Sequence, residues 1–290
     1  MRIGCIDIGS NTTRLLVAEC DGRRLDAVHQ ERAFTRIGSE LLEHGSLGEA
    51  KVAEVVAVVA AQVASARRHG VSEIRAVATE AIRGAANGAE LVRAITAATG
   101  LAIDVLSGEE EARLAFIGAA ATLEQPVEGE LGVVDVGGGS SELVVGRAPS
   151  GVRWWASVGV GSAVLTHTHL LHDPPLPAEI AAARAQTARA LAPLCVPSPT
   201  VALAVGGSAT GLALLAGVML GPAALDDALQ LLACEPSAQV AARYGIDSRR
   251  ARLLPAGLLV LAAVAEAFGT ELRIGRGGIR EGVLLEASGR

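Results

Sequence analysis

The chain has 290 residues, enough for one large domain or two medium ones, and half of its residues are hydrophobic although only 2% are aromatic. Its core must therefore be built from Ala, Val, Leu and Ile. The formal net charge is -6, and no basic run with interleaved aromatic residues occurs, so we expect no nucleic-acid partner. Lys51 is the only lysine, which excludes a Walker phosphate-binding loop and leaves arginine as the phosphate-binding cation.

The cysteines and the apolar stretches exclude further classes. The four cysteines have no CxxC spacing, so neither a zinc site nor a disulfide framework is indicated. Residues 253–268 are too few to cross a membrane, and residues 209–225 are interrupted by Gly and Pro. The chain opens directly into a predicted strand with no sign of a leader. We therefore expect a cytoplasmic protein with no membrane partner.

The first half alternates strands and helices. It begins with three predicted strands, and a long amphipathic helix follows, closed by Gly70. The predicted elements, in order, are strands at 3–8, 14–20 and 25–35, a helix at 47–69, a strand at 73–78, a helix from 79 toward 100, a strand at 102–106 and a helix at 109–121. Residues 122–130 are polar and contain Pro and Gly, which predicts a boundary between domains 1–124 and 125–290.

The second half has the same alternation. We predict strands at 131–136 and directly after residue 140, strands at 154–158 and 201–205, helices at 178–193 and from 209 onward, a strand at 271–274 and a last helix at 280–287. A Gly-Gly-Ser turn is expected at 206–208. Strands alternating with helices in each half predict α/β domains whose sheets are largely covered.

The two halves open with nearly the same segment. Residues 7–17 read DIGSNTTRLLV, and residues 135–145 read DVGGGSSELVV. Each predicts a β-hairpin whose tip presents backbone N–H groups and hydroxyls to one point, as phosphate binding requires. The candidate phosphate-binding residues at the two tips are Ser10, Asn11, Thr12, Gly137, Gly138, Gly139, Ser140 and Ser141.

An aspartate ends the first strand of each copy and can hold a metal ion beside a phosphate. Asp135 and Glu142 flank the second tip, and Mg²⁺ uses one or two carboxylates together with substrate phosphates and water. Asp7 is the matching residue of the first tip. The duplication predicts two domains facing one cleft. The alternative is a pair of ordinary Gly-rich hairpins stabilised by Asx or Ser/Thr turns.

Three other places carry chemistry. Arg83 stands in the first turn of a predicted helix, where a cation is unfavourable unless an anion accompanies it, although it could equally be a surface arginine. Residues 109–111 are three glutamates that could simply complement a helix dipole, and only one of them can face a cleft because successive residues point about 100° apart. Gly207 and Ser208 lead from a predicted strand into a predicted helix, and the N-terminus of such a helix can bind an anion. The alternative is that Ser208 only caps the helix.

The duplicated hairpin resembles the actin, sugar kinase and heat-shock ATPase superfold. Within it, the chain is similar to the exopolyphosphatase and guanosine pentaphosphate phosphohydrolase (Ppx/GppA) family. The matching motifs occur in family order over nearly the whole chain: DIGSN at 7–11, ATEAIR at 78–83, SGEEEAR at 107–113, DVGGGSSEL at 135–143, GGSAT at 206–210 and IREGVL at 279–284.

The resemblance implies two similar ribonuclease H-like (actin-like ATPase superfold) α/β domains with an interdomain cleft, the last helix, about 279–290, packing back on the first domain. It implies a Mg²⁺-dependent hydrolase that releases terminal phosphate from inorganic polyphosphate. Glu111, directly before Ala112 and Arg113, is then the catalytic base, and Arg83 reaches the phosphate. A homodimer is left open.

Two departures from the family pattern qualify this expectation. The segment 161–167 has Val164 and His167 where the family commonly has Arg and Glu, so short phosphate chains should be handled better than long ones, and Gly84 follows Arg83 where the family often has a polar residue. A guanosine pentaphosphate hydrolase remains an alternative, because it uses the same machinery. A sugar kinase or ATPase and a non-catalytic phosphate or alarmone sensor are the others, and fold alone separates none of them.

Overall fold

The computed structural model describes residues 1–289 except 22–23, 124, 126 and 149–150. The chain divides into two compact units. The first comprises Met1–Ala121 and Gly277–Arg290, and the second comprises Thr122–Arg276. The sequence predicted a division between residues 124 and 125, and residue 124 lies outside the described residues. The structure divides the chain just before it, after Ala121.

A five-stranded sheet forms the centre of the first unit, in the order β3-β2-β1-β4-β5. The strands β1 to β3 are antiparallel, whereas β4 and β5 run parallel to β1. The elements are β1 (Arg2–Ile8), β2 (Thr13–Cys20), β3 (Leu25–Ala33), α1 (Ile37–His44), α2 (Glu49–Arg68), β4 (Glu73–Ala78), α3 (Glu80–Gly84), α4 (Gly88–Thr99), β5 (Ile103–Val105), α5 (Gly108–Ala121) and α13 (Ile279–Ser288).

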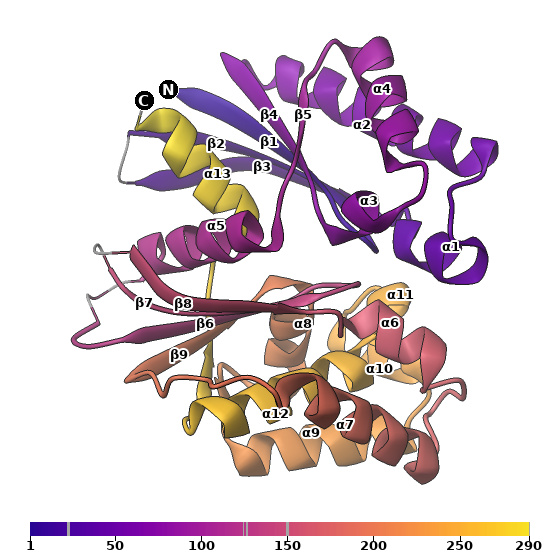
Figure 1. Ribbon diagram of the computed structural model, residues 1–290, viewed down its shortest axis with the longest axis vertical. Helices are drawn as coiled ribbons and strands as arrows, with labels where there is room; N and C mark the ends of the chain where they lie inside the picture. The colour runs from indigo at the N-terminus through magenta and orange to yellow at the C-terminus, as the bar shows by residue number, and fades with distance from the viewer. Residues whose placement is uncertain (22–23, 124, 126, 149–150, 290) are drawn as a thin grey trace. The chain divides into compact units, whose positions relative to one another are not determined.

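Both faces of this sheet are covered, because alternate apolar residues of β1 join two different clusters. On one face, Ile6 and Ile8 of β1 join a cluster with residues of α2 and α4. On the other face, Ile3 and Cys5 join a cluster with residues of α5 and α13. Figure 1 shows α5 and α13 side by side on this second face, although about 160 residues separate them in the sequence.

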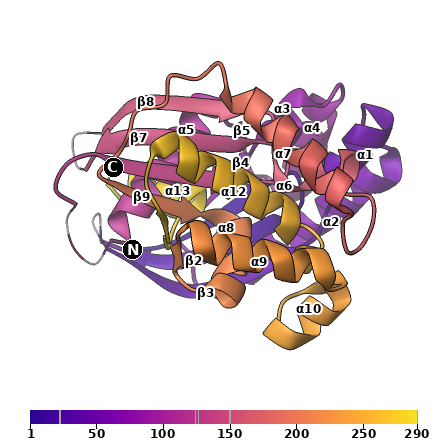
Figure 2. The ribbon, with the colours of Figure 1, turned by 90° about the horizontal axis from the view of Figure 1, so that it is seen from below.

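The second unit contains a six-stranded sheet in the order β10-β11-β9-β6-β7-β8. One large cluster fills the space between this sheet and its helices, which Figures 1 and 2 show stacked against it. The elements are β6 (Leu131–Val136), β7 (Ser141–Arg147), β8 (Gly151–Val158), α6 (Ser162–Thr168), α7 (Pro177–Leu191), β9 (Val201–Val205), α8 (Gly206–Ala216), β10 (Met219–Leu220), α9 (Pro222–Cys234), α10 (Ser237–Tyr244), α11 (Ser248–Ala251), α12 (Leu254–Phe268) and β11 (Leu272–Ile274).

The two sheets repeat one plan, as the duplicated sequence predicts. The order β3-β2-β1-β4-β5 in the first unit corresponds to β8-β7-β6-β9-β11 in the second, and β10 is an added edge strand. The prediction of two similar α/β, ribonuclease H-like domains is therefore confirmed. No helix among the described residues is long and apolar enough to cross a membrane.

Two predicted elements differ in the structure. The helix expected from 79 toward 100 is divided into α3 and α4, because Ala85 is extended and Gly88 lies so close to the Ile82 carbonyl that a Cβ would overlap it. The turn expected at 206–208 is instead the first turn of α8, which begins at Gly206 with no side-chain cap.

Candidate active site

The tips of the two hairpins share one backbone hydrogen bond. Gly9 N–H donates to the Thr12 carbonyl at 3.0 Å, and Gly137 N–H donates to the Ser140 carbonyl at 3.0 Å. Each tip also follows a strand in matched register, with Ile8 opposite Thr13 in the first copy. The repeat seen in the sequence is thus a repeat of hydrogen bonding.

In both copies the start of a helix holds the tip. At the first tip, the backbone N–H groups of Arg36 and Gly38 donate to residues 11 and 10 at 3.1 and 2.8 Å. At the second, Ser162 N–H and its hydroxyl donate to the Gly137 carbonyl at 2.9 and 3.0 Å, and α6 follows. The tips are therefore fixed before any ligand arrives, which reduces the entropy cost of binding.

The hydroxyls of the tips have different surroundings. Ser141 is fully buried and donates to the Val160 carbonyl at 2.6 Å. Ser10 and Ser140 are buried, whereas Asn11 and Thr12 are half-buried. The side chains of Asn11 and Thr12 make no hydrogen bond with any described residue, so they can donate to a ligand.

The three glutamates at the start of α5 lie in different environments. Glu109 and Glu110 are exposed, whereas only 2% of Glu111 is exposed. Glu110 accepts from the Ser107 backbone N–H and hydroxyl, both at 2.8 Å, and the Glu110 N–H donates back to Ser107 Oγ at 3.2 Å. This is a capping box, and its hydrogen bonds lower the pKa of Glu110.

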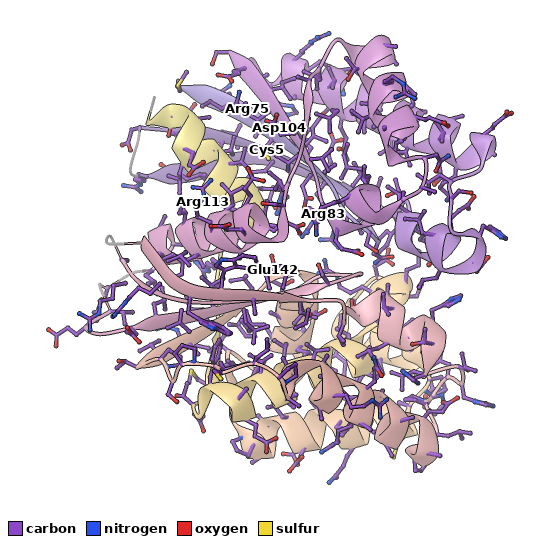
Figure 3. All side chains as sticks on the ribbon, in the orientation of Figure 1. Cys5, Arg75, Arg83, Asp104, Arg113 and Glu142 are labelled. Atoms are coloured by element: carbon purple, nitrogen blue, oxygen red, sulfur yellow. The ribbon has the colours of Figure 1, made fainter. Side chains whose placement is uncertain are left out.

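The structure brings Glu111 and Arg83 together, although 28 residues separate them. Arg83 Nη1 lies 2.5 Å from Glu111 Oε1 and also donates to the Leu106 carbonyl, while about a third of the Arg83 side chain stays exposed. Figure 3 shows Arg83 next to the start of α5. The guanidinium therefore orients the carboxylate and keeps an accessible edge of its own.

Asp135 and Glu142 form a pair of like charges. They lie directly opposite each other on β6 and β7 and are 8% and 3% exposed. Glu142 Oε1 accepts from Ser157 Oγ at 2.9 Å, and Asp135 Oδ1 occupies the space where a Cβ on Gly206 would stand. One or two carboxylates, completed by phosphate oxygens and water, are what Mg²⁺ uses, so this donor set fits Mg²⁺.

Asp7, the matching residue of the first hairpin, differs. Its Oδ2 lies 3.1 Å from Arg14 Nη2, so a cation already accompanies it. Its buried Oδ1 has no hydrogen-bond partner among the described residues. The described residues contain no group of three or more His, Cys, Asp or Glu side chains able to hold a metal ion. A magnesium ion here would take its remaining ligands from phosphate and water.

Arg250 of α11, a cation that the sequence did not single out, lies beside the start of α8. Ser208 Oγ donates to the Val136 carbonyl at 3.4 Å and does not cap α8. Arg250 Nη1 lies 3.4 Å from Thr210 Oγ1, and its guanidinium borders Gly207. Because 40 residues separate Arg250 from Thr210, only the GGSAT motif pointed toward this place.

One groove of the first unit lies away from the predicted site residues. This groove, of about 390 Å³, is lined by side chains that include Arg75, Asp104 and Arg113, labelled in Figure 3. It contains none of the predicted site residues. We define the candidate site by its hydrogen bonds and charges.

The model of the Ppx/GppA phosphatase family matches residues 16–290. The chain belongs to this family. An uncharacterised protein of Streptomyces coelicolor is 33% identical, and the match covers 98% of this chain and 90% of that protein. Exopolyphosphatase 1 of Mycobacterium tuberculosis is 27% identical, with 98% and 88% covered.

Solved structures of the Ppx/GppA family have the same fold. The family member from Aquifex aeolicus superposes with a TM-score of 0.83 at 29% identity, covering 99% of this chain and 97% of that one. An exopolyphosphatase from Cytophaga hutchinsonii superposes with a TM-score of 0.87, and at 21% identity it supports the fold alone. The family resemblance expected from the motifs is confirmed.

Proposed function

We propose that this Ppx/GppA phosphatase is a Mg²⁺-dependent hydrolase that releases the terminal phosphate of inorganic polyphosphate. The observation that carries the proposal is the buried carboxylate of Glu111, held by Arg83 at 2.5 Å while its two neighbouring glutamates face solvent. A buried carboxylate held in a fixed orientation suits a general base. Its position also agrees with the motif SGEEEAR.

In the proposed reaction, Glu111 takes a proton from a water molecule while the water oxygen forms a bond to the terminal phosphorus. The bridging P–O bond breaks, and its electrons leave with the shortened chain. Orthophosphate is released. Arg83 and the backbone N–H groups of the tips stabilise the charge on the phosphoryl oxygens.

Arg83 would share its guanidinium between Glu111 and the phosphate during this cycle. Without substrate, its guanidinium contacts Glu111 and the Leu106 carbonyl. Because one guanidinium has several donors, a phosphate oxygen can bind its accessible edge without releasing both partners. A phosphate that shares the guanidinium charge then weakens the ion pair with Glu111, so the carboxylate becomes a better proton acceptor.

Asp135 and Glu142 are the proposed magnesium ligands of the second unit, and Asp7 is proposed as the corresponding metal-binding carboxylate of the first. A magnesium ion would neutralise the phosphate charge that otherwise repels a carboxylate base. Gly207, Ser208 and Arg250 are proposed to bind a more distant phosphate group. Because Val164 removes one positive charge expected from the family pattern, we propose a preference for short chains.

The family name leaves guanosine pentaphosphate as a second candidate substrate. A phosphate-release assay tests both, using polyphosphates of defined length, guanosine pentaphosphate and ATP, each with Mg²⁺ and with excess chelator. We expect release from short polyphosphate only when Mg²⁺ is present. Higher kcat/KM for guanosine pentaphosphate would reverse the order of the candidates, and tight binding without release would identify a sensor.

A further inference from the structure

Arg36 has an unusual backbone conformation beside the first hairpin tip. Its φ is 48° and its ψ is 40°, and no other non-glycine residue in the described part of the chain has a positive φ. The left-handed conformation costs about 1–2 kcal/mol for a residue with a Cβ and nothing for glycine. Glycine would thus be the less costly residue here, and the arginine side chain requires another explanation.

The neighbours of Arg36 impose this conformation. Thr35 and Ile37 on either side are fully buried, and Thr35 Oγ1 lies 3.0 Å from Thr13 Oγ1. The Arg36 N–H donates to the Asn11 carbonyl at 3.1 Å. The backbone is therefore anchored on both sides and at its own N–H, which is the situation in which strain persists.

The start of α1 and the hairpin tip form one surface. Gly38 N–H donates to the Ser10 carbonyl at 2.8 Å, and a Cβ on Gly38 would overlap Ser10 Oγ. Ser10 is only 6% exposed, and its hydroxyl has no hydrogen-bond partner among the described residues. A buried hydroxyl without a partner, lying against a helix N-terminus, indicates a place for a ligand that can hydrogen-bond to it.

The side chain of Arg36 is exposed and makes no hydrogen bond or ion pair with any described residue. Glu40, the acidic residue in the first turn of α1, instead accepts from Gly48 N–H at 3.1 Å. A cation at a helix N-terminus is unfavourable unless an anion is also present. Arg36 is thus unfavourable in its backbone conformation and in the place of its charge. A bound anion would offset the unfavourable charge.

We propose that Arg36 is a substrate-binding residue, whose guanidinium binds a phosphate group of the phosphoanhydride substrate beside the first hairpin tip. The buried, unpartnered Ser10 hydroxyl completes this phosphate subsite. The inference rests on the proposed function. A guanidinium binds phosphate oxygens through charge-assisted hydrogen bonds. Because this contact forms in both ground and transition states, it acts on KM rather than on kcat.

The test compares Arg36→Gly and Arg36→Lys with the unchanged chain. Arg93 in α4 is an exposed arginine that makes no hydrogen bond or ion pair with any described residue, so Arg93→Gln is the matched control for lost charge. The Kd for tripolyphosphate is measured by titration calorimetry, together with KM, kcat and Tm. We expect Arg36→Gly to raise Kd and KM about tenfold, the worth of one charge-assisted hydrogen bond. We expect kcat to change less than about twofold.

Stability separates a binding role from a structural one. In Arg36→Gly, the relief of backbone strain roughly offsets the larger entropy of the unfolded chain, so Tm should stay within a few degrees. Arg36→Lys should recover part of the affinity, and Arg93→Gln should bind like the unchanged chain. An unchanged Kd in Arg36→Gly would overturn the proposal, and so would a large fall in its Tm. If the unchanged chain itself neither bound nor hydrolysed phosphoanhydrides, the proposed function would fail first.

Discussion

Glu109, Glu110 and Glu111 carry the same functional group, but α5 gives each a different role. Glu110 closes the capping box with Ser107, and Glu109 is exposed. Glu111 is turned into the protein beside Arg83. A rotation of about 100° per residue is enough to separate a capping residue from a candidate base.

Substitution of each glutamate by glutamine tests this division. Glu111→Gln should lower kcat by about 10²–10⁴, the usual worth of general base catalysis, and leave the Kd for tripolyphosphate nearly unchanged. Glu110→Gln should leave kcat unchanged and lower stability by about 1 kcal/mol or less, because it weakens a cap. Glu109→Gln is the matched control. Phosphate release is measured for all three variants. Loss of activity in Glu110→Gln alone would show that the base is misassigned by one residue.

Asp135 provides a second test at this scale. Asp135→Ala should abolish Mg²⁺-dependent phosphate release, measured by titrating Mg²⁺ at saturating substrate. The fold should stay intact, which Tm measured for both chains checks. Full activity of the unchanged chain in excess chelator would rule out this role for Asp135.

The sequence predicts the role of a residue only when the contacts that define its environment are close in the chain. Helical geometry predicted that only one of the three glutamates could face a cleft, and the family resemblance identified it as Glu111. The ion pair with Arg83 could not be predicted, because it joins α3 to α5. Arg36 gave no signal either, since its left-handed backbone follows from contacts with the hairpin tip and not from its own residue type.

At the scale of elements, α5 and α13 touch through glycine. A Cβ on Gly282 would overlap the Leu114 carbonyl oxygen, and a Cβ on Gly118 would overlap the Gly278 carbonyl oxygen. Close approach of the two helix backbones therefore requires the absence of side chains at these two positions. This contact explains why α13 packs on α5.

Gly282→Ala should separate the two helices and lower stability by several kcal/mol, because backbone atoms cannot move aside as a flexible side chain can. Gly289→Ala is the control in the same region, since its Cβ would lie 3.5 Å from the nearest atom, an ordinary contact, and its φ is negative. Denaturant unfolding of both variants measures the difference. Equal stability of the two would contradict the close packing of α5 and α13.

The loop before α7 depends on one carboxylate. Glu179 accepts from the backbone N–H groups of Leu171 and Leu176 at 3.1 and 3.0 Å, and it lies 2.7 Å from His172 Nδ1. The hydrogen bond from His172, followed by those from the backbone, lowers the pKa of Glu179 from 4.5 to about 2. A carboxyl group whose pKa is lowered by folding stabilises the folded state at pH values above its ordinary, unfolded-state pKa. This stabilisation is lost as the pH falls toward the pKa of the folded state.

Glu179→Gln should therefore lower Tm at pH 7. The difference from the unchanged chain should persist down to about pH 5 and then shrink as the pH falls further. Thermal unfolding between pH 7 and pH 3 measures it. A difference that grew on acidification would have the wrong sign for this carboxylate.

The elements that the sequence predicted poorly are short. Neither α1 nor α6, with 8 and 7 residues, was predicted, because neither is long enough to show a clear apolar period. The N-cap of α1 is Arg36, and that of α6 is Gly161, so the usual Ser, Thr, Asp or Asn start signal is missing from both. These two helices nevertheless hold the hairpin tips. The candidate site thus depends on elements with little local signature.

For the whole molecule, the duplicated hairpin predicts more than any single motif does. It indicated two units of one plan, and the two sheet orders correspond strand for strand apart from β10. It could not locate the return of α13 to the first unit, which came only from the family resemblance. Magnesium, the homodimer and the cytoplasmic location stay predictions.

The helix α13, at the end of the chain, completes the core of the first unit. In α13, Ile279, Val283 and Leu284 are buried in the cluster that includes Ile3 and Cys5 of β1. Burial of three such side chains contributes about 1.5–3 kcal/mol each, a total comparable to the whole stability of a domain. A chain ending at residue 276 should therefore lose the fold of its first unit.

Limited proteolysis with mass spectrometry can follow each unit separately. In the chain ending at residue 276, we expect rapid cleavage within residues 1–121 and continued protection of residues 127–276, whose core contains no residue of α13. Leu284→Ala in the full chain should have a smaller effect of the same kind, lowering the free energy of unfolding of the first unit by about 2–5 kcal/mol. Addition of a synthetic peptide of residues 277–290 should restore protection, because it returns the missing part of the core. Protection of residues 1–121 without α13 or the peptide would show that the first unit is stable on its own.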